Sequence, residues 1–146
     1  MYKILVYNDL DFNSNYEVIE FLANKLKEKN YVKEEFVKTI LEREKLFPTG
    51  IPSEIEIALP HCDNTLVKVP SIAVGILNNS VKFNAMDEPS KELNVKLVIM
   101  LALLEPHGHI EMLQKIVKFI QKKNDVEKIL SINNISEIKK IIEINL

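Results

Sequence analysis

The sequence is poor in the residues that build the commonest catalytic and binding motifs. It has one cysteine, Cys62, so no disulfide bond can form within the chain. It has only three glycines, and they form no glycine-rich loop of the kind that holds a nucleotide phosphate. No serine, histidine and aspartate fall in a recognisable nucleophile arrangement. The side chains that remain most interesting for chemistry are the three histidines.

The sequence also lacks the features that direct a chain to a membrane or to nucleic acid. Its most apolar run, LVIMLALLEP, is about half the length that a membrane span needs. The N-terminus lacks the basic start and longer apolar core of a signal peptide. The 19 Lys and Arg residues are scattered and the formal net charge is −2, so no concentrated basic field faces a phosphate backbone. We therefore expect a cytoplasmic protein that binds no nucleic acid.

What is present is the composition of an ordinary globular domain. Hydrophobic residues make up 47% and charged residues 27% of the 146 residues, which suits one domain over residues 1–146. The run 54–59 alternates and predicts a strand with one exposed face, whereas the segment from Leu97 is apolar on both faces and predicts a covered central strand. Further strands are expected over 3–7 and 71–77, with an edge segment at 81–83.

Apolar residues at helical spacing predict helices over 16–30, 33–46 and 109–124. Asp125 and Ser136 are candidate caps for two shorter helices that follow. With about five strands and five helices, the pattern predicts an α/β fold: a single three-layer domain with helices on both faces of the sheet.

All three histidines follow predicted strands. His61 comes after the strand that ends at Leu59, and His107 and His109 come after the buried strand and open the next helix. In open sheets that helices cover, sites collect where strands end. If these two strands are parallel neighbours, His61 and His109 will approach one another.

A neutral imidazole can accept a phosphoryl group, with catalysis supplied by positioning and charge stabilisation. Pro60 restricts the backbone immediately before His61, and a helix N-terminus at His109 would offer amide donors to a phosphoryl oxygen. Two other interpretations stay open. A lone histidine at a strand end is more often structural, and the pair His107 and His109 could bind a metal, although no clear partner carboxylate accompanies it.

The stretch LEREKLFPTGIPSEIEIALPHCD resembles the IIA component of the bacterial sugar phosphotransferase system, of the fructose/mannitol class. The resemblance rests on Arg43-Glu44, then on residues 49–51 (TGI), then on residues 57–61 (IALPH). The flanking residues resemble the galactitol-type branch, and the order of elements matches along essentially the whole chain.

This resemblance implies a fold with a mixed sheet between helices and a defined activity. The protein would accept a phosphoryl group from the phosphocarrier protein HPr on Nε2 of His61. It would pass the group to a cysteine of a cognate IIB component, which serves the membrane component IIC in the uptake of galactitol or a related polyol or sugar. No cofactor or metal is implied.

The resemblance also assigns supporting residues. Arg43 is expected to stabilise the phosphoryl group. Apart from the resemblance, Thr49 is a candidate that could donate to that group or to the His61 ring, or could equally belong to the turn before Gly50. His109 would hold the phosphoryl group or be a surface residue.

Three neighbouring residues are expected to play no direct part. His107 has no counterpart and is expected to be a surface residue. Cys62 is not the acceptor, because the IIB cysteine belongs to another polypeptide, and we expect it to be an exposed thiol open to oxidation. Asp63 would orient a ring or loop, or cap a turn. Two alternative functions are a regulatory module of the same fold and, in a different class, a metal or binding protein with histidine ligands.

Overall fold

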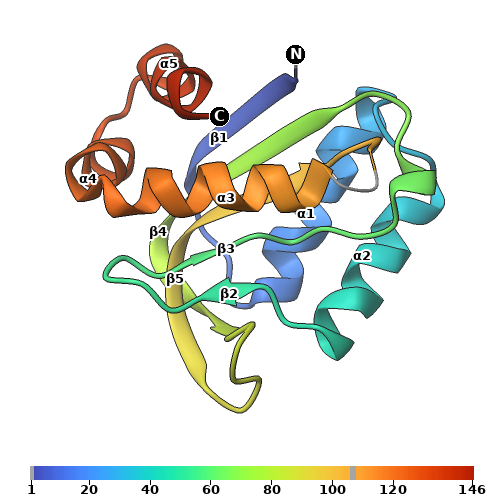
Figure 1. Cartoon of the computed structure of the whole chain (residues 1–146), viewed down its shortest axis with the longest axis horizontal. Helices are drawn as coiled ribbons and strands as arrows, with labels where there is room; N and C mark the ends of the chain where they lie inside the picture. The colour runs from blue at the N-terminus through green and yellow to red at the C-terminus, as the bar shows by residue number, and fades with distance from the viewer. Residues whose placement is uncertain (1, 106–107) are drawn as a thin grey trace.

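The computed structural model describes residues 2–105 and 108–146 (Figure 1). His107 lies outside the described residues, and His109 is described only by its place in a helix. The described residues form a five-stranded sheet and five α-helices. The elements are β1 (Lys3–Leu10), α1 (Asn15–Glu28), α2 (Glu35–Leu46), β2 (Gly50–Ile51), β3 (Ile57–Ala58), a 3₁₀ turn η1 (Asn64–Leu66), β4 (Ser71–Asn84), β5 (Glu92–Ala102), α3 (Gly108–Gln121), α4 (Lys123–Ser131) and α5 (Ile135–Asn145).

The sheet is mixed and has the strand order β1-β4-β5-β3-β2. β1 runs parallel to β4, and β3 runs parallel to β5, while the β4–β5 and β2–β3 pairs are antiparallel. The parallel pairing that the sequence left open, between the segment before His61 and the buried strand, is present, with Ile57 opposite Leu97 and Ala58 opposite Val98.

Helices cover both faces of the sheet, so the molecule has three layers (Figure 1). α1 and α2 pack against one face in a core that includes Leu22, Phe36 and Met100. α3, α4 and α5 pack against the other face in a second core that includes Ile99 and Phe119. From Leu97 to Ala102, successive residues of β5 alternate between the two cores, and this explains the unbroken apolar sequence of that segment. The predicted α/β fold is confirmed.

Two of the predicted strands have different bounds. Only residues 57 and 58 of the run 54–59 pair in the sheet, because the chain bends where the Ser53 hydroxyl donates to the carbonyl of Ile55. The expected exposed face is wrong there, since Ala58 enters the core on the α1 side and Ile57 the core on the α3 side. The expected strand over 71–77 and the edge segment at 81–83 are one strand, β4, whose pairing with β5 has an irregular register between Ile76 and Val81.

The predicted caps of the last two helices are also wrong. Asp125 lies inside the first turn of α4, and α5 is capped by Asn134, whose side chain accepts from the backbone N–H of Glu137. Ser136 lies within α5. Several polar residues near a helix start can act as the cap, and the backbone geometry selects one of them.

Among the described residues, no helix combines the length and the apolar character needed to cross a bilayer.

Candidate functional site

His61 lies at the end of the sheet, next to the last residues of β5. It forms an isolated parallel bridge with Leu101, and the backbone N–H of Leu101 donates to the carbonyl of Pro60 at 2.9 Å. β3 itself ends at Ala58, so residues 59–61 continue alongside β5 without regular strand geometry. This places the imidazole at the carboxyl ends of two neighbouring parallel strands, where sites in such sheets collect.

A backbone hydrogen bond fixes the orientation of the His61 ring. Nδ1 of His61 lies 2.8 Å from the carbonyl oxygen of Leu59. A carbonyl can only accept, so Nδ1 carries the proton, and the lone pair of the neutral ring is on Nε2. Burial lowers the pKa of His61, the hydrogen bond to Leu59 opposes this, and the charge of Arg43 lowers the pKa further. The ring is therefore predominantly neutral at pH 7.

A small apolar pocket of about 140 Å³ adjoins the ring. Its walls include Leu59 and Leu101 from the sheet, Met86 from the loop after β4, and Ile110 from the first turns of α3. Ile110 is 60% exposed, so the pocket opens onto an apolar stretch of surface. The start of α3, to which His109 belongs, thus lies next to His61, although the side chain of His109 is outside the described part of the structure.

Arg43 is an exposed residue in the last turn of α2. Its guanidinium lies over the ring of Phe47, 4.9 Å from the centroid, which limits its freedom. Burial raises the pKa of Cys62, and the charge of Arg43 partly opposes this rise; hydrogen bonds from Thr65 lower the pKa of Asp63, and Arg43 adds to that lowering. Arg43 therefore acts electrostatically on three consecutive residues, of which His61 is the first.

Glu44 and Thr49 form a buried polar pair; the sequence reasoning named Thr49 as a candidate but gave Glu44 no role. Oε2 of Glu44 accepts from the backbone N–H of Thr49 at 2.9 Å, and the Thr49 hydroxyl is 2.7 Å from Oε1 of Glu44. Both residues are buried, and burial raises the pKa of Glu44 from 4.5 to about 7, against the two hydrogen bonds that lower it. A signal for the burial of Glu44 was available in the sequence, because the helical spacing of the apolar residues Phe36 and Ile40 continues to position 44.

The hydroxyl of Thr49 is thus engaged with Glu44 and not with the His61 ring. Thr49 still reaches the histidine through the backbone, because its carbonyl accepts from the N–H of Leu59 at 3.0 Å. Leu59 in turn accepts from His61. A continuous set of hydrogen bonds therefore connects Glu44, Thr49, Leu59 and His61.

The two residues after His61 have structural roles. Cys62 is only 4% exposed and belongs to the core on the α1 side, and burial raises its pKa to about 12. The expectation of an exposed, oxidisable thiol is wrong, because the chain turns the side chain inward after His61. Asp63 caps η1: its Oδ1 accepts from the backbone N–H of Thr65 at 2.9 Å.

The family of this chain follows from comparison with known proteins. The family model described as "Phosphoenolpyruvate-dependent sugar phosphotransferase system, EIIA 2" matches residues 1–144. The galactitol-specific EIIA component of Escherichia coli (strain K12) is 28% identical over 133 residues, which cover 90% of this chain and 88% of that protein.

Solved structures share the fold. The putative PTS IIA (PtxA) of Streptococcus mutans has a TM-score of 0.80 at 19% identity, covering 97% of this chain and 88% of that one. Enzyme IIA for mannitol of Escherichia coli, in its complex with phosphorylated enzyme IIB, has a TM-score of 0.78 at 21% identity, covering 94% and 93%. With a sequence match over residues 1–144, this chain belongs to the EIIA type 2 family of the phosphoenolpyruvate-dependent sugar phosphotransferase system.

Proposed function

We propose that this protein is a phosphoryl carrier that receives a phosphoryl group from phospho-HPr on Nε2 of His61 and gives it to the cysteine of a IIB component. The observation that carries the proposal is the hydrogen bond from Nδ1 of His61 to the carbonyl of Leu59, at the carboxyl ends of β3 and β5. It holds the ring in the tautomer whose lone pair is on Nε2 and aims that atom away from Leu59.

The two transfer steps follow from this tautomer. In loading, the Nε2 lone pair attacks phosphorus, a bond from Nε2 to phosphorus forms, and the bond to the donor breaks with its electron pair leaving on the donor. The ring then carries a positive charge, which the carbonyl of Leu59 stabilises through the Nδ1 proton. In transfer, a thiolate of IIB attacks phosphorus, and the bond electrons return to Nε2. Because Nδ1 keeps its proton, the departing group is a neutral imidazole.

Arg43 supports the transfer by its charge. The phosphoryl group in flight carries negative charge on three oxygens, and a guanidinium near His61 offsets that charge. The guanidinium of Arg43 stacks on the ring of Phe47, and this contact limits the positions that the guanidinium can take. Thr49 acts as a positioning residue through Glu44 and Leu59. His109 at the start of α3 would bring a further nitrogen near the phosphoryl group.

The surface around His61 suits partners that bind and leave. Ile110 and Met86 expose apolar side chains at the rim of the pocket that His61 lines. A small apolar patch around the reacting atom fits a modest, transient interface, and both HPr and IIB must use it in turn. In this proposal the protein acts in the cytoplasm, and IIB passes the group to a galactitol-like polyol or sugar that enters through IIC.

The test is intact-mass spectrometry at neutral pH after incubation with phosphoenolpyruvate, Enzyme I and HPr. Wild type should gain one phosphoryl adduct that mild acid removes, and His61→Ala should gain none. Slower loading of His109→Ala would place His109 in the site. The loaded protein is then mixed with a galactitol-type IIB. Loss of the adduct to the IIB cysteine supports a transport carrier, whereas loading without transfer to any IIB would favour the regulatory alternative. Failure of wild type to load while HPr does so would exclude the proposal.

A further inference from the structure

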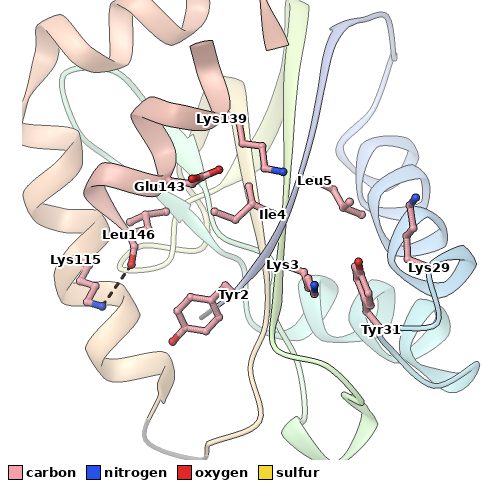
Figure 2. A pocket seen from close by; sticks show the side chains of 10 residues that line it. All are labelled: Tyr2, Lys3, Ile4, Leu5, Lys29, Tyr31, Lys115, Lys139, Glu143 and Leu146. Atoms are coloured by element: carbon pink, nitrogen blue, oxygen red, sulfur yellow. Dashed lines mark hydrogen bonds between the residues drawn. The ribbon is translucent and has the colours of Figure 1, made fainter. Parts of the chain in front are cut away.

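A basic groove runs along the outer edge of the sheet, away from the residues used for phosphoryl transfer. The groove has a volume of about 730 Å³, and four consecutive residues of the chain, residues 2–5, form its floor (Figure 2). β1 begins in this segment and is an edge strand, since among the described strands it pairs with β4 alone. The residues pack on opposite faces: Ile4 against the core on the α3 side and Leu5 against the core on the α1 side. The groove therefore wraps around the strand edge and is not confined to one face.

The backbone of β1 offers hydrogen-bonding groups to this groove. The N–H of Lys3 donates to the carbonyl of Pro70 at 3.1 Å, and the register with β4 places Lys3 opposite Ser71. In a parallel pair, backbone groups point alternately toward the partner strand and away from it. The N–H and C=O of Ile4 therefore point outward into the groove. An outward N–H and C=O on an edge strand is the template that an added strand recognises.

The side chains that flank this edge are mainly basic. Figure 2 shows Lys29 and Tyr31 on one side of β1 and Lys115 and Lys139 on the other. With Lys3, four ammonium groups surround the edge, and among the described lining residues only the side chain of Glu143 is acidic. Within the described part of the chain, the ammonium groups of Lys3, Lys29 and Lys139 make no hydrogen bond or ion pair, whereas Lys115 donates to the carbonyl of Leu146 at 3.4 Å.

We propose that the edge of β1 binds an extended acidic peptide segment of a partner protein, which adds a strand at Ile4 and places its carboxylates among Lys3, Lys29 and Lys139. Charge selects this occupant over a second copy of the same chain, because two copies paired through β1 would bring lysines against lysines. A peptide fits the groove better than a small anion does, because it can pair with the outward backbone groups of Ile4 and contact the apolar side chains of Ile4 and Leu5.

The groove lies at the same end of the sheet as His61. Lys3 is opposite Ser71, Ser71 is opposite Ala102, and His61 bridges to Leu101, the residue before Ala102. Three strand spacings separate the two places, roughly 14 Å along the sheet. A partner held at β1 would therefore sit near the transfer site without covering the His61 pocket, whose lining residues are different. The proposal does not depend on phosphoryl transfer.

The test is a titration of the isotope-labelled full chain by heteronuclear NMR. The probe is a capped peptide of about six residues, the usual length of a strand, with glutamates at both ends and valines between them. The expected result is saturable shifts of the backbone amides in the 2–6 segment and slower hydrogen exchange of the Ile4 amide. The same peptide with lysine in place of glutamate should not bind.

Two matched pairs of variants locate the binding. Lys3→Gln with Lys139→Gln should weaken binding about tenfold, the loss expected for two exposed ion pairs, while Lys38→Gln on α2 should leave it unchanged. Ile4→Pro removes the outward N–H, which an edge position tolerates, together with the packing of the Ile4 side chain, and should abolish binding. Ile4→Ala loses the same packing but keeps the N–H and should bind like wild type. Thermal melting shows which variants are folded.

Several outcomes would overturn the proposal. No saturable shift with wild type would do so, and so would equal binding of the lysine peptide. Shifts that inorganic phosphate reproduces, with Ile4→Pro unaffected, would identify a small-anion site instead. A diffusion coefficient that falls with protein concentration, and recovers in Ile4→Pro, would identify self-association through β1.

Discussion

Leu59 and His61 are joined by a hydrogen bond that makes the backbone part of the site. The carbonyl of Leu59 lies 2.8 Å from Nδ1 of His61, and the N–H of the same Leu59 donates to the carbonyl of Thr49. Thr49 thus holds the N–H of the same residue whose carbonyl accepts from the ring. Leu59 therefore connects the two parts of the motif, Thr49 and His61, because its N–H donates to Thr49 and its carbonyl accepts from His61.

The first prediction concerns the protonation of His61. Burial and Arg43 lower its pKa, so its ring should titrate below the ordinary value of 6.5 and remain neutral through neutral pH. A pH titration followed by imidazole NMR should show this, with the nitrogen signals of an Nδ1-protonated neutral ring. Phosphoryl loading should accordingly stay constant on acidification until the pH falls below 6.5. A pKa above that value, or the proton on Nε2, would contradict the geometry.

The second prediction concerns Arg43. Its replacement in Arg43→Gln should slow loading about tenfold, as a charge that offsets the transition state is lost. The same change should raise the pKa of His61, because the guanidinium lowers it in wild type. Arg43→Lys keeps the charge and should preserve the pKa of His61 while losing the planar geometry. Slower loading with an unchanged pKa of His61 in Arg43→Gln would mean that the arginine acts on a partner protein instead.

The third prediction concerns the buried carboxyl of Glu44. Its pKa of about 7 lies above its ordinary value of 4.5, so the folded protein binds more protons than the unfolded chain between these two pH values. Stability contributed by the protonated group is fully present below pH 4.5 and is lost as the pH rises through 7. Relative to Glu44→Gln, wild type should lose about 3 kcal/mol of unfolding free energy over this window.

Urea unfolding of both proteins at several pH values would measure the difference. The lowered pKa of His61 has the opposite effect on stability below pH 6.5, but it acts in wild type and variant alike and cancels in the difference. Parallel stability curves for the two proteins would contradict a raised pKa of Glu44.

Glu44 also illustrates what the sequence does and does not predict. The apolar pattern identified α2, to which Glu44 belongs, and α1 before it, because burial of one helix face leaves a period in the sequence. The end of the predicted strand at Leu59 placed His61 at the end of the sheet, and the bridge between His61 and Leu101 agrees with it. The spacing of Phe36 and Ile40 does extend to position 44, but it does not predict how a buried carboxyl there is compensated, because the two hydrogen bonds from Thr49 form only in the folded structure.

Cys62 shows the same limit in another way. Its neighbours in sequence predicted an exposed loop after His61, yet the thiol is buried. The direction of one side chain in irregular backbone depends on how residues 59–63 follow β5, and no local pattern encodes that path. The cap at Asn134 and the irregular pairing around Asn78 were also missed. At each place several neighbouring polar residues compete for the same role, and the sequence does not show which one takes it.

The fourth prediction follows from the burial of Cys62. A thiol with a pKa of about 12 has almost no thiolate at pH 8, and its surroundings exclude reagents. Iodoacetamide should therefore leave the folded protein unmodified over hours and alkylate Cys62 rapidly in guanidinium, as intact mass would show. Cys62→Ala serves as the control that identifies the adduct. Fast alkylation of the folded protein would mean that the segment after His61 opens readily.

The fifth prediction concerns Gly50, which follows Thr49 in the motif. A Cβ at this position would lie 2.7 Å from the carbonyl oxygen of Asn84 and 2.9 Å from Cδ1 of Leu93. The first contact is with backbone that pairs in β4 and cannot withdraw without disturbing the sheet. Gly50→Ala should therefore destabilise the protein by about 1–3 kcal/mol, the usual cost of overpacking.

The matched control is Gly75→Ala, where the nearest atoms are the mobile ends of Leu22 and Leu10 at 3.3 and 3.4 Å. Urea unfolding should show a smaller loss of stability in Gly75→Ala, because leucine side chains can shift by the required few tenths of an ångström.

The two glycines should also differ in their effect on function. A displaced Gly50 moves Thr49, whose carbonyl holds Leu59. Gly50→Ala should thus slow the phosphoryl loading of His61 even at temperatures where it is folded, whereas Gly75→Ala should load at the wild-type rate. Equal effects of the two substitutions on loading would show that the hydrogen-bond path from Thr49 to His61 does not govern the site.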